Sequence, residues 1–448
     1  MIGKKVLMQA LCSVLTGLSI SAWSDEQGAA VENTSAHAQL TYNWQHHPAF
    51  RAAYSGPNSI LPVAENMYTF TADAYLGFRP WQDGEVYLTP EVSQGVPFST
   101  MLIGLGGFTN GEITRAAGTN PTLYRQKLFL RQTWNNGGGS QRVEPGQNQL
   151  AGYVDKNRFV LTVGNFSTLD VFDQNAYAKD PRTQFMNWGN WTYAAYDYSA
   201  DARGFGWGFA AEWYKDDWAL RFGRMSGPTK PNELPVDLAL ANHYGDQIEV
   251  EHAHSLYNRP GKLRVLWWRN RAKLASFTDA LAWLQAHPGQ YTGPDALIAV
   301  RTTEKFKYGL GVNVEQEVSD NTGFYLRAMH ADGRTETHAF TEVDSSFSSG
   351  FLFKGNAWAR NADSAGLSVM RNRLSSERRR FLEAGGISYF IGDGGLNYRP
   401  EDIFEGFYSL NLWKSSWLTA DYQRIQNPAY NADRGPINVY ALRFHTEI

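Results

Sequence analysis

The sequence has little cysteine, no excess of basic residues and no long apolar run after its N-terminus. Its one cysteine, Cys12, lies in the N-terminal apolar segment, so a processed chain would contain none, which excludes disulfide scaffolds, thiolate metal sites and cysteine nucleophiles. Without Lys4 and Lys5 the basic count falls from 41 to 39 against 44 acidic residues, so nothing favours nucleic acid as a partner. Because no later run is long enough for a membrane-spanning helix, a membrane form would have to be a closed barrel.

The N-terminus has the three parts of an export signal. Lys4 and Lys5 are basic, residues 6–20 are apolar, and Ala22-Trp23-Ser24 supplies small residues for cleavage. A single membrane anchor is the weaker alternative, because the apolar run is short for a spanning helix. We expect a signal peptide over residues 1–24 that is removed on export, a flexible polar segment over residues 25–36, and one barrel domain over residues 37–448.

Signatures of enzymes are missing as well. There is no glycine-rich phosphate loop in a strand–turn–helix context and no G-x-S-x-G, and the ten histidines form no ligand cluster beyond His252-x-His254, a weak metal signal. The pairs Asp170/Asp173 and Glu315/Glu317 could be compared with glycosidase carboxylates, but alternate strand positions share a face, so lumen lining explains the second pair. We expect no catalytic residue, no metal site and no cofactor.

The chain consists mainly of short segments in which apolar positions alternate with polar ones. Residues 84–95, 127–134 and 159–164 show this period of two, and their apolar sets are predicted to face lipid or core. Turn sequences join such segments at residues 215–217, 258–261, 319–323 and 414–416, and long polar loops occupy residues 227–244, 276–303 and 333–380. Short turns at one end and long loops at the other are typical of an outer-membrane barrel.

Two of the long loops have features of their own. Residues 277–286 have apolar spacing at i, i+3, i+4 and i+7, which predicts a short helix. Residues 371–380 carry five arginines, which we interpret as a solvated loop or a patch held near lipopolysaccharide.

The central stretch, residues 163–204, begins as a strand and then loses its period after Asn165. A segment of this length without periodicity is usually functional or disordered, and its many Phe, Trp and Tyr residues make disorder implausible. We therefore predict that residues 165–204 are an ordered insertion that folds into the barrel and narrows it.

Several segments together resemble one family, the OprB-type carbohydrate-selective porins. They are PAFRAAYSGPNSI (48–60), GEVYLTPEVSQG (84–95), LFLRQTW (128–134), LTVGNFSTLDVFDQNAYAKDPRTQFMNW (161–188) and the ending from WLTADYQRIQNPAYN (417–431) to the last strand. The resemblance implies an all-β fold, a single transmembrane antiparallel barrel of about sixteen strands in the bacterial outer membrane. It also implies passive diffusion of mono- and oligosaccharides through a constriction made by inward-folded loops, with sugar solutes, outer-membrane lipid and lipopolysaccharide as partners.

Candidate residues for the constriction come from the insertion and from the neighbouring wall. A sugar path needs polar side chains for hydroxyl groups, aromatic faces for the C–H side, and binding weak enough to allow release. The candidates are Asp170, Asp173, Asn175, Asp180, Arg182, Trp188 and Trp191 from the insertion, and Glu91, Arg125 and Arg131 from the wall. Structural roles compete: Asp170 and Asp173 as helix caps, Arg182 as a pin to the wall, and the tryptophans as packing.

Two other functions remain open from the sequence. A porin of the same architecture could serve small organic acids or general solutes, because Arg125, Arg131 and Arg182 would also attract anions. A secreted, sugar-active β-rich enzyme is the more distant alternative. The sequence leaves open whether the protein is a monomer or a homo-oligomer.

Overall fold

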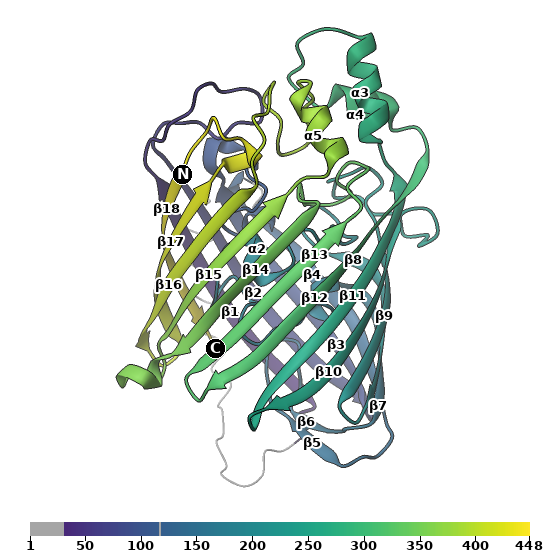
Figure 1. The fold of residues 1–448 in the computed structure, drawn as a ribbon. Coiled ribbons are helices and arrows are strands. Elements are labelled where there is room, and N and C mark those ends of the chain that lie inside the picture. Colours follow the sequence, from purple (N-terminus) through teal and green to yellow (C-terminus); the bar gives the residue numbers. More distant parts are fainter. Residues whose placement is uncertain (1–30, 116–117) are drawn as a thin grey trace, which may run out of the picture.

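The computed structural model describes residues 31–115 and 118–448, and it is a closed antiparallel barrel of 16 strands in which β1 pairs with β18 (Figure 1). The number of strands implied by the family resemblance is therefore confirmed. The wall strands are β1 (Thr34–His47), β2 (Glu65–Trp81), β3 (Gly84–Val96), β4 (Gly118–Asn135), β7 (Arg158–Phe166), β8 (Gly206–Lys215), β9 (Trp218–Ser226), β10 (Tyr244–Leu256), β11 (Arg259–Lys273), β12 (Glu304–Ser319), β13 (Thr322–Ala331), β14 (Ser345–Lys354), β15 (Ser364–Arg373), β16 (Glu401–Trp413), β17 (Ser416–Gln426) and β18 (Ile437–Glu447).

The remaining elements lie in the connections between wall strands. Strands β5 (Ser140–Val143) and β6 (Gly152–Asp155) pair only with each other. The helices are α2 (Trp188–Trp191), α3 (Phe277–Ala286), α4 (Asp295–Val300) and α5 (Ser376–Glu383), with short 3-10 turns at η1 (Phe98–Thr100), η2 (Ile113–Arg115), η3 (Thr168–Asp170), η4 (Gly355–Trp358) and η5 (Pro428–Tyr430). Helix α3 has the bounds predicted from its apolar spacing, and no helix in the described ranges is long and apolar enough to cross a membrane.

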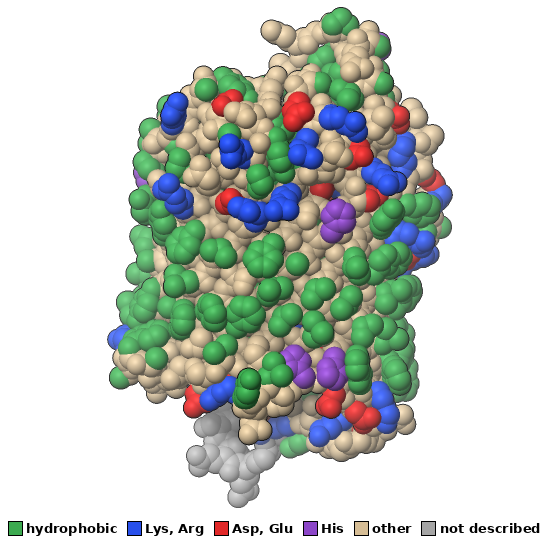
Figure 2. Space-filling view, viewed as in Figure 1, with side chains coloured by type: hydrophobic (Ala, Val, Ile, Leu, Met, Phe, Trp, Pro, Cys, Tyr) green, Lys and Arg blue, Asp and Glu red, His purple; other side chains and the backbone are tan. Residues whose placement is uncertain are grey.

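The alternation along the wall strands separates an inner from an outer face, as predicted. In β3, Tyr87, Thr89 and Glu91 are buried inside the barrel, whereas Leu88 is exposed on the outside. Figure 2 shows apolar side chains gathered in a band around the middle of the viewed face, with charged side chains concentrated above and below it. Apolar atoms on this surface match a lipid interior, and closure of the barrel pairs the backbone groups of every wall strand on both sides.

Most connections at one end of the barrel are two-residue turns. The β10–β11 turn is Tyr257-Asn258, with φ of 51° and 62°, so residues 259–261, predicted as part of a four-residue turn, belong to β11. Positive φ at both central residues matches the right-handed twist of the flanking strands and gives the tightest hairpin. The β12–β13 and β16–β17 turns are likewise shorter than predicted, at Asp320-Asn321 and Lys414-Ser415.

The opposite end carries the long loops, where α3, α4 and α5 gather (Figure 1). The prediction of one long loop over residues 333–380 is wrong, because this range contains β14 and β15. Serine hides the alternation there: Ser346 and Ser348 face inward while Phe347 faces outward. The arginine-rich stretch is also not a uniform solvated patch, since Arg378 is fully buried and pairs with Asp344 at 2.9 Å and with Glu342.

Both ends of the described chain take part in closing the barrel. Strand β1 begins at Thr34, ahead of the predicted boundary at His37, because this segment continues the pairing with β2. The backbone groups of Ala38 and Ile448 exchange hydrogen bonds of 2.8 and 2.9 Å, so the last residue is tied to the first strand.

Candidate functional site

The lumen is largely filled by the connection between β7 and β8, residues 167–205, which we call the lumen insertion. Its aromatic side chains pack together inside the ring of strands: the Trp188 and Trp191 rings meet edge to face at 4.9 Å, and Trp188 stacks on Tyr198. Each such aromatic pair adds about 0.5–1.5 kcal/mol beyond its buried area. The aromatic rings of the insertion, whose packing partners the sequence did not indicate, are therefore packed against one another and against the wall.

Asp173 fastens the start of the lumen insertion to wall strands β12 and β13, which we call the far wall. It has a left-handed φ of 54°, and its carboxylate accepts hydrogen bonds from Arg327 Nε of β13 at 2.8 Å, Asn313 Nδ2 of β12 at 2.6 Å and Thr192 Oγ1 at 2.9 Å. All of these groups are buried, so each bond forms where water cannot replace it. Asn175 extends the same anchor, donating to Asn313 Oδ1 at 2.8 Å.

Arg182 fastens the tip of the lumen insertion to strands β2 and β3, which lie across the barrel from β12 and β13. Its guanidinium lies 2.6 Å from Asp73 of β2 and 3.1 Å from Glu91 of β3, and it pairs closely with Glu112 of the β3–β4 loop. A planar five-donor fork suits this simultaneous pairing with several carboxylates. Arg115 adds a second cation, 3.8 Å from Glu91.

Polar caps shape the insertion on either side of these anchors. Ser167 and Asp170 form a reciprocal capping box at the start of η3, and Asn187 caps α2 by accepting from the Gly189 N–H. Asp170 also pairs with Lys127 of β4 at 2.7 Å. Asp170 therefore has the predicted capping role and faces the remaining open space as well.

Two cavities lie inside the barrel: wall strands β1, β2 and β4 line the inner one, and β2 to β4 and β7 to β9 line the outer one. The outer cavity, near the short turns, has a volume of about 740 Å³, and the inner cavity about 370 Å³. Arg131, Gln149 and Asp170 line both, so these three side chains surround the neck where the cavities meet. Both cavities therefore lie to one side of the barrel axis, because the lumen insertion occupies much of the other side.

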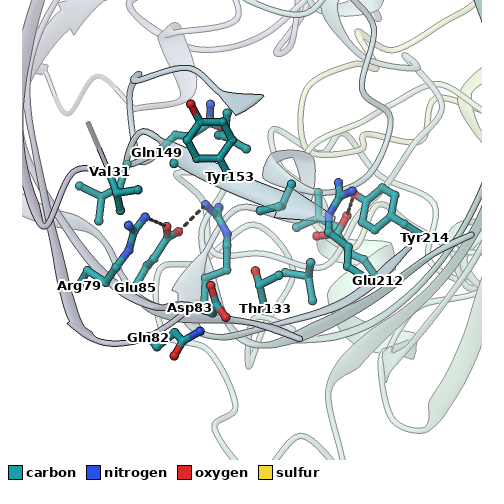
Figure 3. A pocket seen from close by; sticks show the side chains of 18 of the residues that line it. Val31, Arg79, Gln82, Asp83, Glu85, Thr133, Gln149, Tyr153, Glu212 and Tyr214 are labelled. Atoms are coloured by element: carbon teal, nitrogen blue, oxygen red, sulfur yellow. Dashed lines mark hydrogen bonds and ion pairs between the residues drawn. The ribbon is translucent and has the colours of Figure 1, made fainter. Parts of the chain in front are cut away.

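Charged pairs line the walls of the outer cavity (Figure 3). Arg79 and Glu85 lie on one wall at 2.9 Å, and Glu212 and Tyr214 lie on the wall opposite, with Gln149 and Tyr153 between them. Arg131 Nη1 lies 3.7 Å from Glu85 and donates to the Asn148 carbonyl oxygen at 3.2 Å. The neck is therefore polar, and its charged side chains form pairs of opposite charge.

The structure brings together most of the predicted site residues. Six of them line the inner cavity: Arg131, Asp170, Asp180, Arg182, Trp188 and Trp191. Glu91 lies directly behind this surface, where it holds Arg182 and accepts from the Tyr124 hydroxyl. Asp173 and Asn175 line neither cavity and instead hold the insertion to the far wall.

Arg125 does not belong to this group, contrary to the prediction. A β-bulge in β4 pairs Thr89 with Lys127 but Pro90 with Arg125, so Gln126 is an extra residue and the inner face shifts by one position. Gln126 and Lys127 both face the lumen, and the exposed Arg125 stacks on the outer side of Trp207, 5.1 Å from its ring centre. The bulge is the physical reason for the error.

Several lining residues were not predicted. Gln147, Asn148 and Gln149 line the inner cavity, and so do Lys179 and Arg203. The run of three amides after Gly146 is visible in the sequence, but nothing local in it indicates that this segment turns into the barrel. Burial lowers the pKa of Lys179 to about 8, and its ammonium donates to the Asp173 carbonyl oxygen at 3.1 Å.

The described residues offer no group of three or more His, Cys, Asp or Glu that could hold a metal ion. Most of the charged side chains around the two cavities form ion pairs or bonds that hold the lumen insertion. What this arrangement provides chemically is narrow polar space with aromatic side chains in part of its lining.

Comparison with known proteins identifies the barrel. A family model described as carbohydrate-selective porin, OprB family, matches residues 63–448. The high-pH structure of Pseudomonas putida OprB has 14% sequence identity and a TM-score of 0.66, covering 93% of this chain and 94% of that chain. The outer membrane channel DcaP of Acinetobacter baumannii (10% identity, TM-score 0.49, 95% and 99% covered) and a mutant of Rh. blastica porin (8%, 0.45, 93% and 100%) are also similar. A search of curated proteins finds no match.

Proposed function

We propose, from the premise that this chain belongs to the OprB family of carbohydrate-selective porins, that neutral mono- and oligosaccharides diffuse passively along its eccentric path into the periplasm. The protein is a carbohydrate porin of the outer membrane; the solutes it prefers and the residues they touch are the content of the proposal. The path begins at the long loops, crosses the inner cavity and the neck, and leaves through the outer cavity.

The observation that carries this proposal is the lining of the inner cavity. It combines five amide side chains with the aromatic side chains of Phe129, Trp188, Trp191 and Phe205; the amides are Gln39, Gln126, Gln147, Asn148 and Gln149. Gln39 and Gln126 already use their amide N–H groups on Asp73, Tyr75 and Glu91. Gln147, Asn148 and Gln149 each retain an N–H donor for sugar hydroxyl groups, and aromatic faces suit the C–H side of a sugar ring. A passage of this composition replaces part of a sugar's hydration without holding it tightly.

The second candidate, a path for small organic acids, is supported by the basic side chains of the inner cavity. These are Arg115, Lys127, Arg131, Lys179, Arg182 and Arg203. Four of them lie within 4 Å of a carboxylate: Arg115 of Glu91, Lys127 of Asp170, Arg131 of Glu85, and Arg182 of three acids. Because this pairing offsets most of the positive field, we favour neutral solutes.

Liposome swelling with matched solutes tests the choice. Vesicles containing the protein should swell faster in isosmotic neutral sugar than in isosmotic organic-acid salt of similar size. Charge reversal by Arg131→Glu should change ion selectivity, measured as a reversal potential, more than it changes sugar entry. Faster entry of the acid, together with a strong anion preference of the parent chain, would favour the second candidate.

The membrane environment gives further expectations. An outer groove of about 470 Å³ between β14 and β17 combines Phe347, Val369 and Phe404 with Arg371 and Arg424. We propose that a lipopolysaccharide acyl chain lies on the apolar part and a phosphate near the arginines. Replacing both arginines with alanine should reduce the lipopolysaccharide that copurifies; an unchanged amount contradicts this contact.

Processing is a separate expectation. The predicted signal peptide, residues 1–24, lies outside the described residues, and we propose that cleavage after Ser24 leaves Asp25 as the first residue. Intact mass of protein taken from the outer membrane checks this, and a retained leader contradicts it. We also propose that the porin has no enzymatic activity.

A further inference from the structure

The connection between β4 and β7, residues 136–157, differs from the other connections at the short-turn end. Where its neighbours β2–β3, β8–β9, β10–β11 and β12–β13 turn within two residues, it carries its own two-stranded sheet, β5 with β6. We call it the β5–β6 hairpin. Its strand β5 is solvent-exposed, but Leu150 and Ala151 beyond the tip are almost completely buried. The segment therefore leaves the barrel rim and turns back into the barrel mouth.

Side-chain contacts fix the tip against three wall strands. Gln147 Nε2 donates to Gln39 Oε1 of β1 at 2.7 Å, Thr89 Oγ1 of β3 donates to Asn148 Oδ1 at 2.9 Å, and Arg131 Nη1 of β4 donates to the Asn148 carbonyl oxygen. The Asn148 backbone has a φ of 53°, which lets the tip turn sharply between these partners. The tip is thus positioned by the wall.

A second set of bonds holds the returning arm of the hairpin. The Leu150 N–H donates to the Tyr87 hydroxyl at 2.9 Å. Glu32, just before β1, brackets Ala151: its N–H donates to the Ala151 carbonyl oxygen at 3.0 Å, and its carboxylate accepts from the Ala151 N–H at 2.7 Å. A loop that is held at its tip and along its returning arm has a fixed position relative to the path.

That position is the neck. Gln149 lines both cavities, Gln147 and Asn148 line the inner one, and Asp170 of the lumen insertion lines both from the other direction. The passage is therefore narrowed by two elements that enter from opposite ends of the barrel. The lumen insertion enters from the long-loop end, and the β5–β6 hairpin enters from the short-turn end.

We propose that Gln147 and Gln149 of the β5–β6 hairpin form an exit subsite that binds the hydroxyl groups of a sugar as it leaves the inner cavity. The Gln147 amide uses one N–H on Gln39, and the Gln149 amide uses one N–H on the Glu144 carbonyl oxygen. By its inventory of groups, each amide retains a second N–H and a carbonyl oxygen for the solute. The subsite rests on the proposed sugar path, which it deepens by naming its last contact before the periplasm.

Substitutions can separate the effect of the amide groups on sugar binding from the effect of neck width on conductance. Gln147→Met and Gln149→Met keep side-chain length and remove both the donor and the acceptor. Each lost sugar hydrogen bond should raise the half-blocking sugar concentration roughly fivefold. The ion conductance of Gln149→Met should change little because the neck keeps its width. Gln147→Met also removes the bond to Gln39, so its conductance shows whether the tip keeps its place. Gln149→Asn keeps the amide on a shorter side chain and should retain more of the sugar block than Gln149→Met.

The test is single-channel recording in a planar bilayer with glucose titrated from each side. The matched control is Gln141→Met on exposed β5, which belongs to the same hairpin but lines neither cavity and should behave like the parent. Faster migration of unboiled protein in SDS gels verifies that each barrel is closed. The two methionine substitutions are also combined in one chain; if that double variant does not close, Gln149→Met alone is compared with Gln149→Asn.

The outcomes separate the two proposals. If the parent shows sugar block and the methionine variants lose several-fold in affinity, the exit subsite is supported. If the parent shows sugar block and the methionine variants equal it, the subsite is wrong and the sugar path stands. If the parent shows no sugar block, the proposed function itself fails, and the subsite fails with it.

Discussion

Arg182 holds the tip of the lumen insertion to strands β2 and β3, and its replacement tests whether the insertion limits the path. In Arg182→Met the side chain keeps most of its length and loses its charge. The carboxylates of Asp73, Glu91 and Glu112, none of which is exposed to solvent, then lose the cation that bridges them. Removing one partner of a buried ion pair costs about 3–5 kcal/mol.

We take the lower value, about 3 kcal/mol, because Arg115 remains near Glu91. If this free energy is lost from the equilibrium between the docked and the released tip, release becomes on the order of a hundredfold more frequent. The tip contributes Asp180 and Arg182 to the inner cavity, so its release should widen the path. Single-channel recordings should show a higher or fluctuating conductance, whereas the parent should conduct at one level.

Arg264→Met is the matched control. Arg264 is as deeply buried, but its carboxylate partners, Glu251 and Glu315, both belong to wall strands. Its loss should lower the temperature at which unboiled protein loses its fast migration in SDS gels, without changing conductance. An Arg182→Met barrel that closes normally and conducts at the parent level with parent noise would refute the idea that this cluster holds a constriction.

Three further perturbations address other parts of the molecule. Because burial lowers the pKa of Lys179 to about 8, raising the pH from 7 to 9 should neutralise its ammonium group and shift the reversal potential toward cation selectivity. Lys179→Met should show the shifted reversal potential at both pH values. A parent whose reversal potential does not shift contradicts this. Arg125→Ala should leave conductance and sugar block unchanged, since Arg125 lies outside the barrel, and a change in either would place it in the path. Burial also lowers the pKa of His338 from 6.5 to about 4, so the unfolded chain takes up this proton first as the pH falls. The free energy of unfolding should therefore decrease by roughly 3 kcal/mol between pH 6.5 and 4, seen as lower resistance to heating. His338→Gln should remove this part of the decrease, and a pH profile identical to that of the parent would contradict it.

Local pattern was sufficient to predict most of the wall. The alternation in β3 assigned Tyr87, Thr89 and Glu91 to the inner face, where they lie. It failed in β14 and β15, because serine at inward positions gives little contrast with its neighbours. Turn lengths were overestimated because polar residues such as Arg259 were assigned to the turn, although strands near the rim tolerate polar side chains.

The site was harder to predict, because its geometry depends on contacts between residues far apart in the chain. Loss of period after Asn165 marked the lumen insertion, but only the fold separates Arg182, beside the path, from Asp173, pinned to the far wall by Arg327. One extra residue in β4 was enough to turn Arg125 outward. The β5–β6 hairpin gave no local signal at all, since its place in the lumen follows from partners on β1, β3 and β4.

The most direct test of the sugar path is the titration of neutral sugars against the current of a single parent channel. A path lined by amides and aromatic faces, with its charges paired, should be blocked by sugar in a saturable way and at weak affinity. The block should be largely independent of ionic strength, because neutral solutes are not attracted by the screened charges of the lining. Absence of block over the whole concentration range, combined with strong anion selectivity, would contradict the account.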